Sequence, residues 1–287
     1  IDTGVRADHT QLSGRVAAGY TAVSDGRGSA DCHGHGTHVA GTIGGSTTGV
    51  AKSVSFIPVR VLGCRGSGSY SGVIAGINWM ITHHIAGVPA VANMSLGGSV
   101  SAAMNQAVAN AVADGITMVV AAGNNNSLAC RYSPASEPLA ITVGATTSVD
   151  ARASYSNYGS CLDIFAPGSS ITSAWISGVD ATRDASGTSM ASPHVAGAAA
   201  IYLGLNPNAS VAQVAQYLDA ESTKDVITGL KAETVNKHLY VSPTDGGAPI
   251  VPPVVAQKSV TNITHQAADV LIDVNPGFAP TTLSFEY

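Results

Sequence analysis

The chain has 287 residues, which is long for one domain but within reach of a single large α/β domain. Charged residues make up only 11% of the chain, well below the roughly 25% of typical usage. The formal net charge is −5 and no basic cluster is present, so we expect no nucleic-acid partner. No uninterrupted apolar run reaches the roughly 18 residues that a membrane helix needs, so we expect no membrane association.

Apolar periodicity predicts that helices and strands alternate along the chain. Residues 70–84 and 101–114 carry apolar side chains at helical spacing, and a further helix is expected to begin at His35. Apolar and β-branched runs that stop at glycine or turn residues predict strands instead. The expected strands are 54–62, 91–96, 117–122, 139–143 and 162–165, and the remaining helices are 187–203 and 210–219.

Alternating strands and helices indicate a mostly parallel sheet that is covered by helices on both faces. Ligands of such sheets bind beyond the carboxyl ends of the strands. Asp2, Leu96-Gly97 and Asn124 each follow an expected strand at its carboxyl end. We therefore expect a functional site where these positions meet.

The composition changes near Ser242, where a Pro/Gly-rich segment at 242–254 is typical of a linker. Beyond it, residues 268–274 and 281–287 are expected as short strands around Asn275-Pro276-Gly277. A few dozen residues cannot bury a core of their own. We therefore expect 255–287 to be the start of a β module or of a C-terminal extension, here cut short.

Four cysteines allow three pairings, and none of them stands in the C-x-x-C spacing of zinc or redox sites. Pairing in sequence order would close two loops of similar size, and in the loop-entropy model each bond would contribute roughly 3.5–4 kcal/mol as an upper value. Two disulfides would indicate an oxidising compartment. Four buried free thiols are the alternative.

Ser189 stands between small residues at the start of an alanine-rich run that is expected to be a buried helix. The positive end of that helix and its free N–H groups would face the hydroxyl, which is where a nucleophile belongs if negative charge forms beside it. An ordinary serine at a helix N-terminus is the alternative, and only the rest of the chain can decide between the two.

Three segments together resemble the signatures of the subtilases, in the order Asp, His, Ser that belongs to this family. They are Asp2-Thr3-Gly4, the stretch from His35 to Thr42 and the stretch from Gly187 to His194. A closer resemblance to the proteinase K and aqualysin branch rests on residues 133–138 and 165–168 and on the positions of the cysteines. The resemblance covers about residues 1–240.

Membership of this family implies a subtilisin-like three-layer α/β fold and a serine endopeptidase with an acyl-enzyme intermediate. Ser189 would be the nucleophile, His35 the general base, and Asp2 the group that orients His35. Asn124 would donate a side-chain N–H to the oxyanion together with the backbone N–H of Ser189. A turn residue in an Asn run is the alternative for Asn124.

The resemblance also implies a substrate cleft in which two edge segments hold an extended peptide as an added strand. Small, uncharged walls of the primary pocket would favour an apolar or aromatic residue before the cut. The edge residues are Gly66, Ser67, Gly68 and Tyr70 on one side and Ser95, Leu96 and Gly97 on the other, and the pocket residues are Ala121, Ala122, Gly123 and Tyr132.

A structural Ca²⁺ site is implied in the same way, formed by Asp163 with the carbonyl groups of Pro138 and Ala140. A solvated Asp in a turn is the alternative. Asp25 and Asp31 could form another cation site, but their separation by Gly and Arg does not favour it.

The cysteine positions of this branch imply the disulfides Cys32–Cys64 and Cys130–Cys161.

Three histidines at positions 33, 35 and 38 invite a zinc interpretation, but no His-Glu-x-x-His motif and no obvious third ligand accompany them. We expect His38 to pack or hydrogen-bond beneath His35, and His194 to be structural.

Two other classes of function remain as alternatives. A non-catalytic binding protein would not need the intact Asp2, His35, Asn124 and Ser189, and an α/β-hydrolase esterase would need Gly-x-Ser-x-Gly, where position 191 is Ala.

Subtilases have more chain before the catalytic Asp than the single residue Ile1 found here. We therefore expect 1–241 to be a catalytic domain whose N-terminal part is missing, together with the secretion signal and the prosegment that acts as inhibitor and folding aid. The expected protein is a secreted, extracellular monomer that acts on proteins and peptides. Ser192 stands where threonine is commoner in the family.

Overall fold

The computed structural model describes residues 1–241, 254–261 and 269–275. For the last two ranges it gives the strands and their pairing. The chain divides into two units, Ile1–Val241 and Ser242–Tyr287, and each is described by itself.

The first unit is built on a six-stranded sheet with the order β11-β12-β8-β7-β5-β3. Neighbouring strands run parallel from β3 to β12, and only the edge strand β11 is antiparallel to its neighbour. The strands are β3 Ala90–Met94, β5 Ile116–Ala121, β7 Ile141–Thr146, β8 Ile164–Pro167, β11 Thr223–Lys224 and β12 Lys237–His238. The carboxyl ends of β3 and β5 therefore lie side by side, as the sequence predicts.

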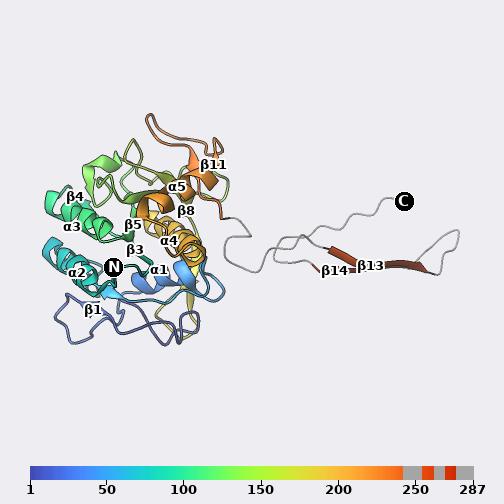
Figure 1. Cartoon of the computed structure of the whole chain (residues 1–287), viewed down its shortest axis with the longest axis horizontal. Helices are drawn as coiled ribbons and strands as arrows, with labels where there is room; N and C mark the ends of the chain where they lie inside the picture. The colour runs from blue at the N-terminus through green and yellow to red at the C-terminus, as the bar shows by residue number, and fades with distance from the viewer. Residues whose placement is uncertain (242–253, 262–268, 276–287) are drawn as a thin grey trace. The chain divides into compact units, whose positions relative to one another are not determined.

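Helices cover both faces of this sheet (Figure 1). Helices α2 and α3 pack together, with α3 against β5, while α4 crosses β3, β5, β7 and β8 on the opposite face. Helices α1 and α5 both pack against α4. Their bounds are α1 His35–Gly44, α2 Tyr70–His83, α3 Ala102–Ala113, α4 Thr188–Leu205 and α5 Val211–Glu221, and a 3₁₀ turn spans Ala129–Arg131.

Alternation along β5 explains the two-sided core. Met118 and Val120 belong to the hydrophobic cluster under α2 and α3, whereas Val119 between them belongs to the cluster under α4. Successive side chains of a strand point to opposite faces, so a strand buried on both sides is apolar throughout. The predicted three-layer subtilisin-like α/β architecture is confirmed in this arrangement. Within the described residues, no helix has the length and apolarity to cross a membrane.

Residues Ile1 and Asp2 lie between the six-stranded sheet and a second, two-stranded parallel sheet. That small sheet consists of β1 Tyr20–Thr21 and β2 Val59–Arg60. Asp2 donates its N–H to the carbonyl of Val59 at 3.0 Å and accepts from the N–H of Val61 at 2.9 Å. On its other side, the amine of Ile1 donates to the carbonyl of Asn93 at 3.0 Å. Asp2 is thereby held at the carboxyl-end edge, beside the end of β3.

Several expected strands differ from the structure by two residues or more at one end, among them 91–96, which ends at Met94, and 162–165, which spans Ile164–Pro167. Only Val59–Arg60 of the expected strand 54–62 pairs as a strand, because Phe56 makes an isolated bridge to Val16 instead. The expected strand 139–143 begins two residues later, at Ile141, because Leu139 belongs to a turn and is 54% exposed. Three short antiparallel ladders of the first unit were not predicted, namely β9 Ile171–Ala174 with β10 Thr182–Ala185, β4 Gly98–Ser99 with β6 Tyr132–Ser133, and β11 with β12.

The second unit contains an antiparallel pair of strands, β13 Val254–Thr261 and β14 Asp269–Asn275. The expected strand 268–274 corresponds to β14. Strand β13 was not predicted, and its first residue falls inside the expected linker 242–254. The rest of that linker and the expected strand 281–287 lie outside the described residues.

Candidate functional site

His35 and Asp2 form the first pair of the site. The ring nitrogen Nδ1 of His35 lies 2.7 Å from Oδ1 of Asp2, which also accepts the N–H of Thr3 at 2.7 Å. Burial alone would raise the pKa of the buried Asp2, but the charge and hydrogen bond of His35 outweigh it and lower the pKa. Burial likewise opposes protonation of His35, yet the Asp2 carboxylate raises the pKa of this imidazole above its ordinary value. The Asp2 carboxylate therefore stabilises the protonated form of the His35 imidazole relative to an isolated histidine.

The first turn of α1 fixes His35. A helix begins with N–H groups that have no partner inside the helix, and here three consecutive ones are satisfied by side chains. His35 donates to Nδ1 of His33 at 3.3 Å, Gly36 to Oγ1 of Thr3 at 2.8 Å, and Thr37 to Oδ2 of Asp31 at 2.9 Å. Thr3 therefore connects the Asp2 segment directly to the helix that carries His35.

Asp31 is a residue whose importance sequence reasoning missed. Its half-buried carboxylate accepts five hydrogen bonds, which come from the Thr3 hydroxyl, the N–H groups of His33 and Gly34, and the N–H and hydroxyl of Thr37. An Asp placed four residues before an expected helix start was the available signal, since carboxylates favour helix N-termini. Asp31 organises the loop that delivers His35.

Ser189 lies in the first turn of α4 and is half-buried. Its hydroxyl donates to the carbonyl of Ser95 at 3.1 Å, and within the described part of the chain it makes no hydrogen bond to His35. Catalytic hydrogen bonds are often loose without substrate and tighten in the complex. The structure thus places the serine at the carboxyl end of β3, with its hydroxyl turned toward the edge segment.

Pro193 explains a second contact of the same turn. A proline has no N–H, so the carbonyl of Ser189 four residues earlier loses its donor within the helix. The hydroxyl of Ser95 donates to that carbonyl at 2.8 Å instead. Ser192 donates to Oδ1 of the buried Asn93 at 2.7 Å, and Nδ2 of Asn93 donates to the Ser95 hydroxyl at 2.9 Å. A hydroxyl and amide network therefore docks the serine-bearing turn onto β3.

Asn124 follows β5, and its side chain is oriented by Thr188. Its Oδ1 accepts the N–H and the hydroxyl of Thr188, at 2.8 Å and 3.0 Å. Its Nδ2 and the backbone N–H of Ser189 have no acceptor among the described residues. A Cβ at position 187 would lie 3.4 Å from this Nδ2 and 3.6 Å from this backbone nitrogen, so both nitrogens lie close to one position beside Ser189.

The predicted substrate edges are joined through Tyr70. The exposed loop of Gly66, Ser67 and Gly68 leads into α2, and the Tyr70 hydroxyl donates to the carbonyl of Ser99 at 2.6 Å. Ser99 pairs with Tyr132 in the β4–β6 ladder. Leu96 packs into the cluster under α2 and α3, and Gly97 is exposed. The pocket residues Ala121, Ala122 and Gly123 run on from the end of β5, and Tyr132 packs against the cluster that contains Ala122.

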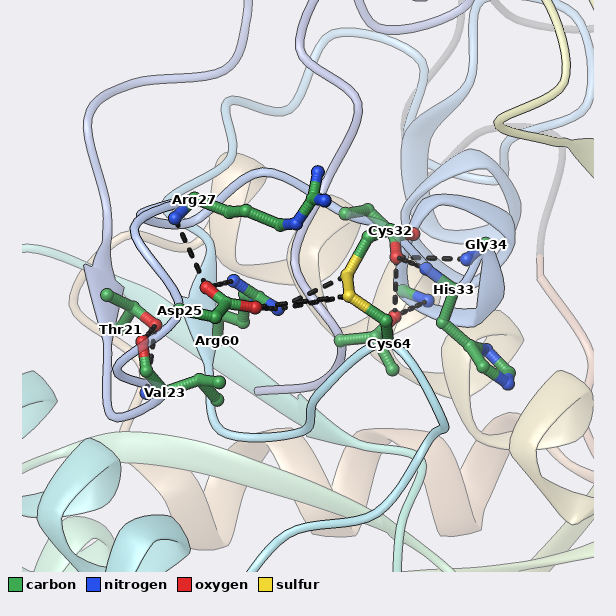
Figure 2. The surroundings of a disulfide bond; sticks show 12 residues. Thr21, Val23, Asp25, Arg27, Cys32, His33, Gly34, Arg60 and Cys64 are labelled. Carbon is green, nitrogen blue, oxygen red and sulfur yellow. Dashed lines mark hydrogen bonds and ion pairs between the residues drawn. A yellow bond between two sulfur atoms is a disulfide. The ribbon is translucent and has the colours of Figure 1, made fainter.

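The structure joins Cys32 to Cys64 and Cys130 to Cys161. Figure 2 shows the first disulfide with Asp25 and Arg60 beside it. The fully buried Arg60 makes a two-bond ion pair with Asp25 at 2.8 Å and 2.6 Å, and one of its nitrogens lies 3.2 Å from Sγ of Cys32. The hydrogen bond from Arg60 lowers the pKa of Asp25 to about 2. Asp25 and Asp31 thus both accept hydrogen bonds from protein donors.

The other histidines are engaged in packing contacts rather than in a metal site. Nε2 of the buried His38 lies 3.0 Å from the carbonyl of Ile171 and 2.9 Å from that of Arg183, so it carries the proton toward the β9–β10 hairpin. Nδ1 of His194 lies 2.8 Å from the carbonyl of Met190 on the same helix. Among the described residues, no group of three metal-ligating side chains includes a histidine.

Asp163 lines a cavity of about 310 Å³, which lies where β7 and β8 begin, at the edge of the sheet opposite to the strands' carboxyl ends. Its Oδ2 accepts the N–H of Thr142 at 2.7 Å, and burial raises the pKa of its carboxyl group. Pro138 and Ala140 line the same cavity, so the three residues expected to hold Ca²⁺ lie around one cavity. Lys237 also lines it and is paired with Asp219 at 2.5 Å. These residues fit a hard cation, with the Lys237 ammonium held by its own partner.

The structure therefore brings an Asp–His pair, a serine and two donors without an acceptor among the described residues to the carboxyl end of a mostly parallel α/β sheet. The chain belongs to the subtilase family, whose model matches residues 1–240. The chain resembles a solved structure, a cold-adapted subtilisin-like serine proteinase, with a TM-score of 0.80 and 49% identity over 84% of this chain and 86% of that one.

Two curated relatives define the similarity further. The chain is 56% identical to an extracellular serine proteinase of Thermus sp. (strain Rt41A) over 240 residues, which are 84% of this chain and 58% of that protein. It is 52% identical to an alkaline serine exoprotease A of Vibrio alginolyticus, over 84% of this chain and 44% of that protein. The chain spans about half the length of the curated relatives it matches.

Proposed function

We propose that this protein is a serine endopeptidase that hydrolyses peptide bonds through an acyl-enzyme. One observation carries the proposal. The hydrogen-bonded pair of Asp2 and His35 lies at the carboxyl-end edge of the sheet, as does the helix start where Ser189 is close to two N–H donors that have no acceptor among the described residues. Proteins of this family named as serine proteinases support the same assignment.

In the first half-reaction, Oγ of Ser189 attacks the scissile carbonyl carbon while Nε2 of His35 accepts the hydroxyl proton. Asp2 holds Nδ1–H of His35, which leaves Nε2 as the basic nitrogen and stabilises the imidazolium. The C–N bond then breaks, and His35 gives the proton to the leaving amine. In the second half-reaction, water attacks the acyl ester, His35 accepts its proton, and Ser189 leaves with that proton.

Asn124 and the N–H of Ser189 would stabilise the oxyanion of both tetrahedral intermediates. Thr188 orients the side-chain amide of Asn124 by donating two hydrogen bonds to its Oδ1. The Nδ2–H groups of Asn124 therefore remain available for substrate. Donors fixed before the reaction need no reorganisation when charge develops, and removing one such donor costs about 2.7–4 kcal/mol in a related site.

The substrate would bind as an extended strand between the segments 66–70 and 95–97. Backbone pairing accepts many sequences, so selectivity rests on the pocket of Ala121, Ala122 and Gly123 with Tyr132 beside it. These small, uncharged walls support a preference for apolar or aromatic residues before the cut. The substrates are proteins and peptides.

We further propose a secreted, extracellular monomer that is inhibited by its own prosegment before maturation. The two disulfides support an oxidising compartment, and the Thermus relative is named extracellular. Asp163 with the carbonyl groups of Pro138 and Ala140 would hold a structural Ca²⁺, which stabilises the loop before β7 and supplies no step of the reaction.

The test is labelling with a serine-directed fluorophosphonate, followed by peptide mapping and an assay of peptide hydrolysis. We expect the label on Ser189 and loss of both label and hydrolysis in Ser189→Ala. Ser160→Ala, a serine beside the second disulfide, is the matched control and should keep both. Hydrolysis that persists in Ser189→Ala, or labelling elsewhere, would refute the assignment.

A further inference from the structure

Asn157 is a completely buried polar residue that has no place in the chemistry described above. It lies between β7 and β8, more than thirty residues along the chain from Asn124. Burying a side-chain amide costs free energy unless its polar atoms are hydrogen-bonded. The hydrogen-bond partners of Asn157 therefore indicate its structural role.

The side chain of Asn157 and its backbone N–H have all their partners in the segment 122–127, which carries Asn124, while the Asn157 carbonyl accepts from the neighbouring Ser156 hydroxyl. Its Nδ2 donates to the carbonyl of Ala122 at 2.8 Å, and its backbone N–H donates to the carbonyl of Gly123 at 2.9 Å. Its Oδ1 accepts the N–H groups of Asn125 at 3.0 Å and of Ser127 at 3.1 Å. One side chain and one peptide group therefore bind the backbone on both sides of Asn124.

Gly123 shows how closely this segment sits on Asn157. Its φ of +100° lies in the region that favours glycine, and a Cβ there would come within 2.4 Å of Nδ2 of Asn157. The next residue, Asn124, is exposed and has only its Oδ1 fixed, by Thr188. Without Asn157, the backbone beside Asn124 would keep only bonds further along the segment, such as that from the N–H of Asn126 to the carbonyl of Tyr155, and Thr188 would hold the Asn124 side chain.

We propose that Asn157 is a positioning residue for oxyanion stabilisation, which acts by fixing the backbone that aims Nδ2 of Asn124 at the reacting carbonyl. The inference rests on the proposed serine endopeptidase function. Donors of this kind act only if they are held within a few tenths of an ångström of the developing charge, and a displacement of about 1 Å can cost 10²-fold in rate.

A second asparagine in the chain provides a matched control. The side chain of Asn236 also hydrogen-bonds to the backbone of a loop. Its Oδ1 accepts the N–H of Ile227 at 2.9 Å, and its Nδ2 donates to the Ile227 carbonyl at 3.1 Å. It makes no contact with the segment 122–127 among the described residues. A general effect of removing a loop brace should therefore appear equally in Asn157→Ser and Asn236→Ser.

The test is a double-mutant cycle on kcat with a peptide substrate, with rates divided by the concentration of titratable active sites. We expect Asn124→Ala to lower kcat about 10²–10³-fold and Asn157→Ser about 10–100-fold, with KM little changed in both. The double variant should be no slower than Asn124→Ala, because Asn157 acts through the group already removed. Asn236→Ser should keep wild-type kcat in both backgrounds.

Effects of Asn157→Ser and Asn124→Ala that multiply would overturn the proposal, as would a wild-type kcat in Asn157→Ser. Asn157→Asp serves if the serine variant does not fold, because it keeps the size and the acceptor of the side chain and replaces the donor to Ala122 by a repelling oxygen. A wild-type kcat in Asn124→Ala is a different result. It would show that the proposed oxyanion role of Asn124 is wrong and that Asn157 has nothing to position.

Discussion

Oδ2 of Asp31 accepts both the backbone N–H and the hydroxyl of Thr37, at 2.9 Å and 2.7 Å. Thr37 is two residues beyond His35 on α1, and the other carboxylate oxygen holds Thr3, next to Asp2. One side chain therefore joins the two segments that supply the Asp–His pair.

Replacing Asp31 by Asn should lower both stability and activity. An amide cannot accept at both of its ends, so the donors on one side lose their partner. We expect the free energy of unfolding to fall by about 2–4 kcal/mol and kcat/KM to fall at least about tenfold. Denaturant unfolding and peptide kinetics measure the two effects. The exposed Asp8, whose partner is Arg6, provides the control Asp8→Asn, which should change neither. Unchanged kcat/KM in Asp31→Asn would contradict the role given to this loop.

The pH dependence of kcat/KM should report the Asp2–His35 pair. Activity requires neutral His35, and although burial opposes its protonation, Asp2 raises the pKa of His35 above 6.5. The acid limb of the profile should therefore lie above pH 6.5. In Asp2→Asn the limb should move to lower pH, and kcat should fall about 10⁴-fold, the loss seen in other serine proteases. A limb that stays in place after this replacement would show that Asp2 does not set the pKa of His35.

His38 should make the fold sensitive to acid. Burial lowers the pKa of His38, which also faces the charges of His35 and Asp184, and its buried Nδ1 has no hydrogen-bond partner among the described residues. The unfolded chain then binds a proton at a pH where the folded chain does not, so stability falls as the pH drops below about 6.5, by at most about 1.4 kcal/mol per pH unit.

In His38→Gln this titration is absent. We expect lower stability at pH 7 but a smaller difference between pH 7 and pH 5 than in the wild type, measured by urea unfolding. His194, whose pKa is also lowered by burial, should contribute a similar slope of its own, which His194→Gln would remove. An identical pH slope in wild type and His38→Gln would exclude His38 as a source.

Removing Ca²⁺ should lower the melting temperature. A ligand present at 100 times its Kd stabilises by about 2.7 kcal/mol, which corresponds to roughly 5–10 °C for a domain of this size. We expect a chelator to cause such a shift in the wild type and none in Asp163→Asn, because Asp163 is the only side-chain donor of the proposed set. Asp180→Asn, at an exposed site, should keep the wild-type response. An equal response to chelator in Asp163→Asn would place the ion elsewhere.

The apolar elements could be predicted from the sequence because burial leaves a periodic signal. Helices α2 and α3 begin and end within one residue of the predicted bounds, and β5 is off by one residue at each end. The β9–β10 hairpin left no such signal, since Arg183 and Asp184 are exposed and its pairing does not depend on an apolar face.

The candidate site likewise contains residues that could be predicted from the sequence and residues that could not. The positions of Asp2, His35, Asn124 and Ser189 at strand ends and helix starts follow from the pattern and from the family resemblance. The local bonds of Asp31 to His33, Gly34 and Thr37 leave a sequence signal, an Asp before a helix start, whereas the role of Asn157 could not be found in this way because the fold brings its side-chain partners to it. The partners of Asn157 lie about thirty residues away in the chain, and which N–H groups need an acceptor depends on how the loops close.

Pro193 has a consequence for the order in which this site assembles. The carbonyl of Ser189 has no donor within its own helix, and Ser95 beyond β3 provides one. The first turn of α4 therefore lacks a full set of hydrogen bonds until β3 has docked against it. The geometry of the serine is consequently a product of tertiary assembly rather than of helix formation, and it should be among the last features to form when the protein folds.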